Sequence, residues 1–421
     1  MERLGKLAIC STEIVGLMNF GEHPFIFVRL RGTPMNKLTR DLIKITDLVP
    51  NNLAIVESDS QITYKDFLGL VGSLAEVFFR CFQENEPRCI AIACDKNKFA
   101  YAAKFATLMA GGFYVPINRN LPKNIIQKIL KQTRPAAVFY GDDTPLNSPI
   151  QAAEIGINDI KSRCFERVVE PSHIGYIKFT SGSTGEPKGV VVSQRAMNSY
   201  VSWVQDAFEP SYNDRWSQHP SNAFDISVTD TFGALTSGCS LYPVRSVTDL
   251  SLPAEWIREN EISIWNSVPS VLNMMSKAKQ ITNKHFASVR LFNFCGEILY
   301  KSHVDQILKA APSATVQNTY GPTEATVACK SIKFDRKSFK NYPSTTVELG
   351  NDLPAVKTFI VENELLITGD QLAEGYLNDH ATTRKNFFDF FDGVDSVLCY
   401  RSGDIVRTDQ SGRVFFSGRR D

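Results

Sequence analysis

A run of small, hydroxylated and glycine residues that ends in a lysine has the clearest chemistry in the sequence. It follows the apolar-leaning stretch 176–179 and reads Thr-Ser-Gly-Ser-Thr-Gly-Glu-Pro-Lys-Gly over residues 180–189. Glycines let a backbone approach a ligand closely and turn successive N–H groups into one concavity. The hydroxyl groups add hydrogen-bond donors, and Lys188 adds a positive charge. The run therefore predicts a cradle for the phosphates of a nucleotide, with a flexible surface loop as the alternative.

The order of residues in this run excludes one common phosphate loop. A Walker A loop needs Gly-Lys followed by Ser or Thr, whereas Lys188 lies between Pro187 and Gly189. P-loop kinases and GTPases are therefore excluded.

The composition is that of a globular protein with a large core. The chain has 421 residues and a mass of 47.1 kDa, with 43% hydrophobic and 22% charged residues, so it is long enough for two or three structural units. Lys and Arg total 46 against 45 Asp and Glu, a net charge of +1. This balance gives no bulk attraction for nucleic acid or anionic membrane, and no apolar stretch approaches the roughly 18 residues of a spanning helix. We expect neither nucleic acid nor a membrane as a partner.

The nine cysteines are scattered along the chain and form no CxxC or Cys/His cluster. Structural zinc and a disulfide framework are therefore poor interpretations. Reduced cysteines in a cytoplasmic protein explain the pattern most simply.

Buried strands alternate with helices over most of the chain. The stretch 89–93 predicts a strand, 98–110 a helix and 113–116 another strand, and this pattern continues to about residue 330. Short strands without intervening helices follow. We therefore expect an α/β fold with two doubly wound layers over residues 36–330 and a small antiparallel β unit over residues 331–421, while residues 1–35 have no clear pattern.

Six segments resemble, in the same order, the motifs of the adenylate-forming superfamily, which includes acyl-CoA synthetases, luciferases and the adenylation domains of nonribosomal peptide synthetases. They are Ile-Thr-Tyr-Lys-Asp-Phe (62–67), Leu-Met-Ala-Gly-Gly-Phe-Tyr-Val-Pro-Ile-Asn (108–118), the run at 176–190, Asn-Thr-Tyr-Gly-Pro-Thr-Glu (318–324), Tyr-Arg-Ser-Gly-Asp (400–404) and Gly-Arg-Arg-Asp (418–421). The resemblance extends from about residue 50 to the last residue. It implies the large N-terminal core of an adenylation domain, without the mobile C-terminal lid.

The resemblance implies a reaction and its cofactors. A carboxylate attacks the α-phosphate of ATP, with Mg²⁺ present, to give an acyl-adenylate and pyrophosphate. Tyr320 is expected to stack on adenine, Asp404 to accept from the ribose hydroxyls, and Arg419 to lie near ribose and phosphate. Thr180 and Glu324 are the expected catalytic residues, Thr180 at a phosphate oxygen and Glu324 as the Mg²⁺ ligand. The full set expected around the nucleotide is Thr180, Ser181, Gly182, Ser183, Thr184, Gly185, Lys188, Gly296, Glu297, Asn318, Thr319, Tyr320, Gly321, Thr323, Asp404 and Arg419.

The segment Phe224-Asp225-Ile226-Ser227 indicates the branch of the superfamily. In amino-acid-activating members, the Asp of this motif pairs with the α-ammonium group of the substrate, and a buried ammonium needs an opposite charge. The alternative role for Asp225 is a helix N-cap. His219 matches a position that gates the acyl pocket in relatives, with a partly exposed loop histidine as the alternative.

The residues expected around the substrate side chain are largely polar, and Asp225 is the one acid among them. This set predicts a small or polar uncharged amino acid, and it disfavours an aromatic or cationic one. Together with Thr319, the set is His219, Asp225, Ile226, Thr229, Asn266, Asn293, Cys295, Val327 and Ala328.

The resemblance also implies partners. The aminoacyl group is expected to pass to the phosphopantetheine thiol of a carrier protein, and a small accessory protein is a further expected partner. Asp421 matches the hinge that precedes the lid, and the lid carries the lysine that bridges the substrate carboxylate and the α-phosphate. Adenylation by this chain alone is therefore expected to be slow or absent. The stretch 359–366 is also shorter than the superfamily pattern by about one hairpin, which puts the local β geometry in doubt.

Two other functions remain open from the sequence. An acyl- or aryl-CoA ligase would form an adenylate in the same way as an amino-acid-activating enzyme, but from a different acid. The presence of Asp225 argues against this function. A nucleotide-binding module that lacks the lid and catalyses no reaction would have the same fold. The argument against this function is that the sequence keeps the phosphate run, Glu324 and Asp404.

Overall fold

The computed structural model describes residues 35–94, 96–141, 152–161, 165, 167–180 and 186–420, and the backbone alone of residues 18–20, 23–25 and 181. Within residues 1–35, the described backbone forms a short antiparallel pair, β1 (Met18–Phe20) and β2 (His23–Phe25).

The first large sheet has seven strands and carries the phosphate run. The five neighbouring strands β9, β6, β5, β7 and β8 are parallel, whereas β10 pairs antiparallel with both β9 and β20. In order across the sheet they are β20 (Gly375–Tyr376), β10 (Pro187–Ser193), β9 (Ile174–Ser181), β6 (Phe113–Pro116), β5 (Cys89–Ile92), β7 (Ala137–Phe139) and β8 (Ala153–Ile155).

The second large sheet has nine strands. Its centre is parallel, and antiparallel pairs close both of its edges. In order they are β17 (Asn351–Asp352), β16 (Lys330–Phe334), β15 (Thr315–Tyr320), β14 (Leu291–Phe294), β13 (Ile264–Ser267), β11 (Arg215–Gln218), β12 (Ser240–Pro243), β3 (Leu53–Val56) and β4 (Gln61–Thr63).

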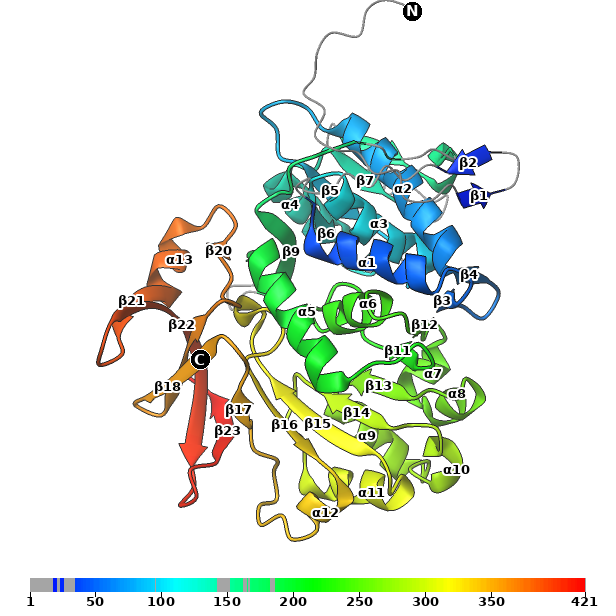
Figure 1. The fold of residues 1–421 in the computed structure, drawn as a ribbon. Coiled ribbons are helices and arrows are strands. Elements are labelled where there is room, and N and C mark those ends of the chain that lie inside the picture. Colours follow the sequence, from blue (N-terminus) through cyan, green and yellow to red (C-terminus); the bar gives the residue numbers. More distant parts are fainter. Residues whose placement is uncertain are drawn as a thin grey trace, which may run out of the picture.

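Helices cover both faces of each large sheet. Because the parallel strands are buried on both faces, their sequences are nearly continuous apolar runs. The space between the sheets holds the largest hydrophobic cluster, with α1 (Lys37–Leu48), α2 (Tyr64–Cys81), α3 (Lys98–Met109), α5 (Gln194–Phe208) and α6 (Ser227–Leu235). Figure 1 shows α5 and α6 between the two layers. The outer faces are covered by α4 (Lys123–Thr133) on the first sheet and by α8 (Ala254–Glu259), α9 (Pro269–Lys277), α10 (Asn283–Phe286) and α11 (Lys301–Ala310) on the second.

Short elements fill the connections between these layers. They are α7 (Val247–Ser251), α12 (Arg336–Phe339), α13 (His380–Asn386) and the single turns η1 (Ile157–Asp159) and η2 (Thr323–Ala325). No helix in the described part of the chain is both long and apolar enough to cross a membrane.

A third, antiparallel sheet lies beside the two layers (Figure 1). Its strands are β18 (Val356–Val361), β19 (Glu364–Gly369), β22 (Ser396–Thr408), β21 (Phe387–Phe391) and β23 (Val414–Arg419). The shortened stretch forms a tight hairpin: Val361 pairs with Glu364, and the two turn residues, Glu362 and Asn363, have φ of 50° and 64°. Two positive φ values are typical of a two-residue turn that matches strand twist, so the local β geometry is regular.

The expected fold class is confirmed: two α/β layers are followed by an antiparallel sheet. The boundaries at residues 35 and 330 stay predictions. Some strands after residue 330 complete the larger sheets, since β16 and β17 extend the second sheet and β20 extends the first.

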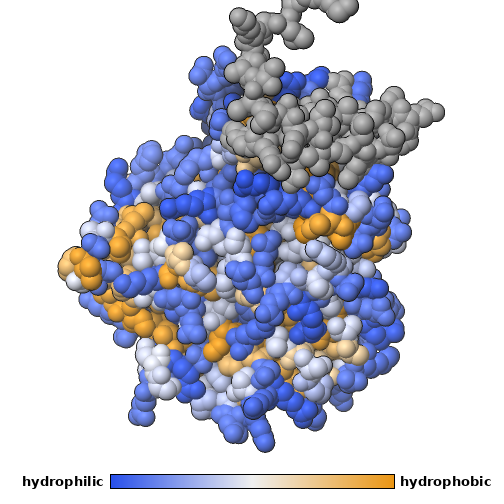
Figure 2. All heavy atoms as spheres, in the orientation of Figure 1, coloured by the Kyte–Doolittle hydropathy of each residue, from blue (hydrophilic) through white to orange (hydrophobic). Residues whose placement is uncertain are grey.

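Exposed apolar side chains gather on the third sheet. Phe391 and Val394 are 66% and 80% exposed, and Ile360, Val361 and Leu398 are also exposed. Figure 2 shows hydrophobic surface on the side of the molecule where this sheet lies.

Candidate active site

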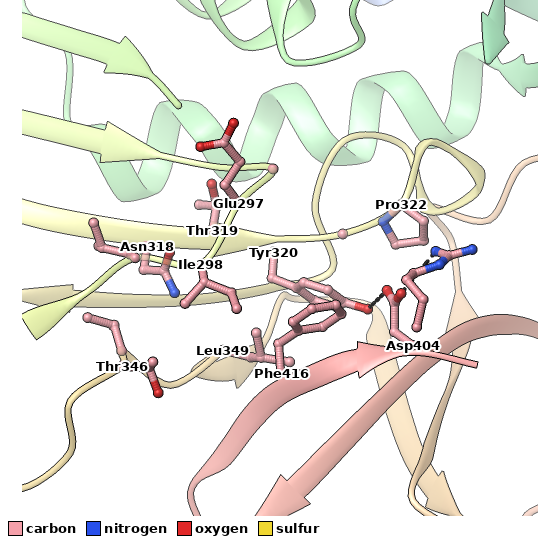
Figure 3. Close-up of a pocket in the computed structure, with 15 residues that line it drawn as sticks. Glu297, Ile298, Asn318, Thr319, Tyr320, Pro322, Thr346, Leu349, Asp404 and Phe416 are labelled. Carbon is pink, nitrogen blue, oxygen red and sulfur yellow. Dashed lines mark hydrogen bonds and ion pairs between the residues drawn. The ribbon is translucent and has the colours of Figure 1, made fainter. Parts of the chain in front are cut away.

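A cavity of about 370 Å³ opens where the end of β15 faces the third sheet. Figure 3 shows the rings of Tyr320 and Phe416 side by side in this cavity, with Leu349 beneath them. Its walls come from the β14–α11 connection, the 318–322 segment, the 346–349 segment and strands β22 and β23. The lining residues are Gly296, Glu297, Ile298, Leu299, Asn318, Thr319, Tyr320, Gly321, Pro322, Thr346, Val347, Leu349, Asp404, Phe416 and Arg419.

Asp404 is the charged centre of this cavity. One carboxylate oxygen accepts a hydrogen bond from the Tyr320 hydroxyl, and the other accepts from the Arg419 guanidinium at 2.9 Å (Figure 3). Burial and the neighbouring Asp404 charge raise the pKa of Tyr320, so its hydroxyl keeps its proton. A carboxylate is an acceptor at both of its oxygens, which is the chemistry that the hydroxyl groups of a ribose need.

Two other predicted nucleotide residues line the cavity, but their side chains are already engaged. The Asn318 amide donates to the Glu348 carbonyl at 2.8 Å. The Glu297 carboxylate accepts from the backbone N–H and hydroxyl of Ser270, at 2.7 and 3.0 Å, at the start of α9. Glu297 therefore offers its backbone and aliphatic part to the cavity rather than a free charge.

The turn after β15 is tightly folded. A Cβ on Gly321 would lie 2.5 Å from the Cα of Ala328, so this position accepts no side chain. Thr326 and Val327 follow with φ of 53° and 75°, which is rare for β-branched residues. Backbone strain of this kind is found at functional sites. In this strained turn, the predicted pocket residues Val327 and Ala328 lie against the end of β15.

A second group of predicted residues lies around Tyr376, which comes from the far end of the chain. Thr180 and Lys188 are opposite each other in the β9–β10 pair, and the Lys188 ammonium is 5.9 Å from the centre of the Tyr376 ring. The Tyr376 hydroxyl donates to Glu324 at 2.7 Å. Glu324 and Thr323 are both on η2. The structure therefore brings Thr180, Lys188 and Glu324 into one neighbourhood.

Part of the phosphate run lies outside the described residues. Gly182, Ser183, Thr184 and Gly185 are not described, nor is the side chain of Ser181. Asp421, the expected hinge, also lies outside them.

Asp225 lies between the two large sheets. Burial, and to a smaller extent the charge of Asp225, raises the pKa of Tyr176, of Tyr200 and of Cys295 at the end of β14. Asp225 does not cap α6, which begins without a side-chain cap. Among the residues that the structure describes, none donates a hydrogen bond to its carboxylate. This half-buried charge is therefore free to bind a cation.

The polar pocket residues are bonded to one another. Asn266 and Asn293 are opposite each other on β13 and β14, and the Asn293 amide donates to the Asn266 carbonyl oxygen at 2.7 Å. The Asn266 amide donates in turn to Asp230 at 2.7 Å. Thr319 donates to the Phe294 carbonyl at 3.1 Å, and Thr229 bonds to the Tyr200 hydroxyl at 2.7 Å.

Asp230 is a buried acid that accepts a hydrogen bond from the predicted pocket residue Asn266. It is fully buried on α6, directly behind Asn266, and it also accepts from the Trp216 indole at 3.0 Å. Burial raises its pKa to about 8. At neutral pH the protonated acid is therefore favoured, and Asp230 adds little charge to the wall.

The apolar part of the pocket comes from Ile226, Cys295, Val327 and Ala328, all of which are buried. The Cys295 thiol faces the Val327 carbonyl at 3.9 Å, and burial raises its pKa to about 12. The thiol is therefore uncharged at neutral pH.

His219 is not joined to the other pocket residues by any hydrogen bond within the described part of the chain. Its ring packs 4.9 Å from that of Trp265 and bonds to the Leu250 carbonyl at 2.8 Å and the Ser267 hydroxyl at 3.2 Å. Burial lowers its pKa to about 4, so the ring is neutral.

Sequence reasoning missed four residues that the structure brings to the site: Lys178, Tyr200, Asp230 and Tyr376. A signal existed for Lys178, which is a lysine in an otherwise buried strand. Tyr200 and Tyr376 carried no local signal, because their roles depend on which segments pack together.

The chain resembles known proteins over most of its length. Residues 46–377 match the family model described as AMP-binding enzyme. A D-alanine–D-alanyl carrier protein ligase from Staphylococcus aureus (strain Newman) is 28% identical over 394 residues, which are 92% of this chain and 79% of that protein.

Solved structures agree with this match. The Vibrio cholerae adenylation domain AlmE, in complex with glycyl-adenosine-5'-phosphate, has a TM-score of 0.79 and 26% identity, covering 94% of this chain and 81% of that one. The Klebsiella oxytoca NpsA N-terminal subdomain, in complex with 3-hydroxybenzoyl-AMSN, shares the fold, with a TM-score of 0.77 and 21% identity over 90% of this chain and 99% of that one. With the motifs and the cavity described above, the match over residues 46–377 shows that this chain belongs to the AMP-binding enzyme family, whose members form adenylates.

Proposed function

We propose that this chain binds ATP with Mg²⁺ and activates a small, uncharged α-amino acid as its aminoacyl-adenylate, for transfer to the thiol of a carrier protein. In the activation step, a carboxylate oxygen bonds to the α-phosphorus of ATP, and the bond between that phosphorus and pyrophosphate breaks. The observation that carries the proposal is the half-buried carboxylate of Asp225, which receives no hydrogen bond from the described residues and lies near the buried end of β14.

The cavity around Tyr320 suits a nucleoside. Two aromatic rings, Tyr320 and Phe416, offer flat apolar surface for the base. Asp404 offers acceptor lone pairs for the ribose hydroxyls, and its bonds to Tyr320 and Arg419 fix its orientation. Neighbouring residues of one cavity thus suit the base and the ribose.

The group around Tyr376 suits the phosphates and a magnesium ion. Thr180 and Lys188 supply a hydroxyl donor and a positive charge for phosphate oxygens. Glu324 keeps a lone pair for a cation beside its bond to Tyr376. The described residues contain no cluster of three or more His, Cys, Asp or Glu that could hold a metal. Mg²⁺ would therefore share Glu324 with phosphate oxygens, as it often does, and would neutralise phosphate charge.

Asp225 suits the α-ammonium group of the substrate. A carboxylate between two sheets, without a donor from its surroundings, gains most from a ligand that brings a positive charge. An acid without an amine would leave this charge unpaired. The site therefore favours amino acids over fatty or aromatic acids.

The hydrogen bonds within the pocket wall favour a small side chain. Asn293, Asn266 and Asp230 use donors and acceptors on each other, so a polar substrate side chain finds few groups without a partner. Ile226, Val327 and Ala328 fill the remaining surface with apolar atoms. Of the two substrate classes expected from the sequence, these contacts support the small one.

The relatives support the same class. The Staphylococcus aureus relative is named for D-alanine and for its carrier protein, and the Vibrio cholerae domain is in complex with a glycyl adenylate. We therefore propose glycine or alanine as the substrate and a carrier-protein thiol as the acceptor. The resemblance likewise supports a cytoplasmic location and, as a further proposed partner, a small accessory protein.

An aryl-acid ligase is the second candidate, because the Klebsiella oxytoca subdomain of the same fold is in complex with a 3-hydroxybenzoyl ligand. Asp225 opposes this function. Stacked aromatic walls would favour it, but the polar row of Asn266 and Asn293 lies where such walls would be needed.

Adenylate formation in a single turnover tests the proposal. The chain, in molar excess over ATP and with Mg²⁺, is incubated with glycine, alanine, phenylalanine, benzoate or octanoate, and the quenched product is identified by mass spectrometry. We expect glycyl- or alanyl-adenylate and little product from the other acids. Asp225→Ala should lower product from the small amino acids at least about a hundredfold, whereas Asp206→Ala, an exposed acid on α5, should not. Benzoyl- or octanoyl-adenylate as the main product would contradict the proposal.

A further inference from the structure

Lys178 is a buried lysine in the strand that leads to the phosphate run. It lies in the middle of β9, is 1% exposed, and precedes Thr180 by two residues. A lysine is almost never fully buried without partners. Burial lowers its pKa to about 7, while the charge of Asp225 acts in the opposite direction. Because burying a lysine is unfavourable, we looked for a specific role of Lys178 among its partners.

The partners of Lys178 bracket Asp225 along the chain. The ammonium donates to the Asn222 carbonyl at 2.5 Å, to the Phe224 carbonyl at 3.0 Å and to the Ser227 hydroxyl at 3.4 Å. Ser227 closes the same loop from the other side, because its hydroxyl donates to the Phe224 carbonyl at 2.6 Å. All three donors of the ammonium group are thus used to hold the loop 222–227.

Asp225 depends on this loop for its orientation. The described residues give its carboxylate no hydrogen bond, and α6 begins after it without using it as a cap. Its position is therefore set by the backbone on either side, which is the backbone that Lys178 binds. Since Lys178 and Thr180 are on one strand, the same contact ties the loop to the strand of the phosphate run.

We propose that Lys178 is a positioning residue for substrate recognition, which holds the loop 222–227 so that Asp225 meets the α-ammonium group of the amino acid. This inference rests on the proposed function. Lys178 acts through Asp225 and does not itself touch the substrate. Its loss should therefore affect recognition of the ammonium group and leave recognition of the nucleotide intact.

The test measures the dissociation constants of three ligands by calorimetry. Glycyl-sulfamoyladenosine carries the ammonium group, acetyl-sulfamoyladenosine lacks only that group, and AMP reports the nucleotide site. The wild-type chain should prefer the glycyl over the acetyl ligand. Lys178→Met should reduce this preference at least tenfold and change AMP affinity less than twofold. In an Asp225→Ala background, Lys178→Met should change the preference no further.

Two further variants keep the test decisive. Lys330→Met removes another buried lysine, which binds Asp352 of the second sheet and Thr358 of the third sheet, and it should leave the preference unchanged. Ser227→Ala loosens the same loop without removing a buried charge, and it should reduce the preference if Lys178→Met does not fold. An unchanged preference in the folded Lys178 variant or in Ser227→Ala, or an equal loss for AMP, would overturn the inference. A wild-type chain that binds AMP but shows no preference would overturn the proposed function, and the inference with it.

Discussion

Tyr376 and Glu324 show how a single hydroxyl can fix the orientation of the carboxylate that we propose as the Mg²⁺ ligand. Their hydrogen bond of 2.7 Å joins a residue of β20 to one of η2, and a hydrogen bond to a charged group contributes about 1.5–3 kcal/mol. We predict that Tyr376→Phe weakens binding of ATP with Mg²⁺ by about 10- to 100-fold, because Glu324 loses its fixed orientation. Calorimetry with AMP and no metal is the control, and that affinity should not change. An equal loss for both ligands would mean that Tyr376 only stabilises the fold.

Asp404 gives a second prediction for a single residue. Asp404→Ala removes the acceptor for the ribose and also releases Tyr320 and Arg419. The AMP dissociation constant should rise by at least about tenfold. Asp409→Ala is the matched control, since Asp409 also pairs with an arginine, Arg413, but at the far end of β22. Equal effects of the two substitutions would contradict a binding role for Asp404.

Asp230 predicts how stability changes with pH. The folded chain keeps a proton on Asp230 up to about pH 8, whereas the unfolded chain releases it near its ordinary value of 3.8. Because the folded state binds the extra proton, this group lowers the free energy of unfolding as the pH rises from about 4 to 8, by at most about 1.4 kcal/mol per unit.

Asp230→Asn imitates the protonated acid and removes this dependence. Its amide oxygen can accept from Asn266 and Trp216 as the carboxylate oxygen does. In urea unfolding, the variant should gain stability relative to the wild type between pH 5 and pH 8. A difference that stays constant with pH would show that Asp230 does not titrate in this window.

At this scale, sequence motifs predicted which residues meet but not how they bond. Tyr320, Asp404 and Arg419 belong to local motifs, and the structure places them around one cavity. The chain from Asn293 through Asn266 to Asp230 was not predictable, because it depends on the register of β13 against β14 and on the packing of α6.

At the scale of elements, the turn between β15 and β16 sets the geometry of both the cavity and the substrate pocket. Gly321 lies against Ala328 and Cys329, where a Cβ would be 2.5 Å from backbone atoms. We predict that Gly321→Ala lowers the free energy of unfolding by about 1–3 kcal/mol and weakens AMP binding, since Tyr320 is adjacent.

Gly412→Ala is the control for this prediction. Gly412 also has a special backbone, with φ of +83°, but no atom lies within 4 Å of a Cβ built there. It should cost only the penalty of a left-handed alanine, roughly 1 kcal/mol, with AMP binding unchanged. Normal AMP binding by Gly321→Ala would contradict the role given to the turn.

Local sequence patterns predicted the helices and strands well, but they did not predict which distant strands pair with each other. The helix expected at 98–110 is α3, and the strand expected at 113–116 is β6. The hairpin of β3 and β4, however, joins the second sheet through β12, almost 190 residues later in the chain. β20, only two residues long, joins the first sheet and brings Tyr376 with it. Hydrophobic periodicity carries no information about such partners.

At the scale of the whole molecule, the site exists where three sheets meet. The first sheet brings the phosphate run, the second brings Tyr320, Asn266 and Asn293, and the third brings Asp404 and Arg419. This arrangement lets motifs that are spread over residues 180–419 contribute to one proposed site. It also explains why each sheet alone would be unable to bind an adenylate.

The central claim is that this assembled site recognises the adenylate of a small amino acid, and competition between adenylate analogues tests it most directly. The N-glycyl, alanyl, phenylalanyl, acetyl, benzoyl and octanoyl derivatives of sulfamoyladenosine are offered together to a limiting amount of the chain, and the bound ligand is measured by native mass spectrometry. The account predicts that the glycyl or alanyl ligand is retained at least about a hundredfold over the acetyl, benzoyl and octanoyl ligands, because these leave Asp225 unpaired. Retention of the benzoyl or octanoyl ligand above both small aminoacyl ligands would contradict it.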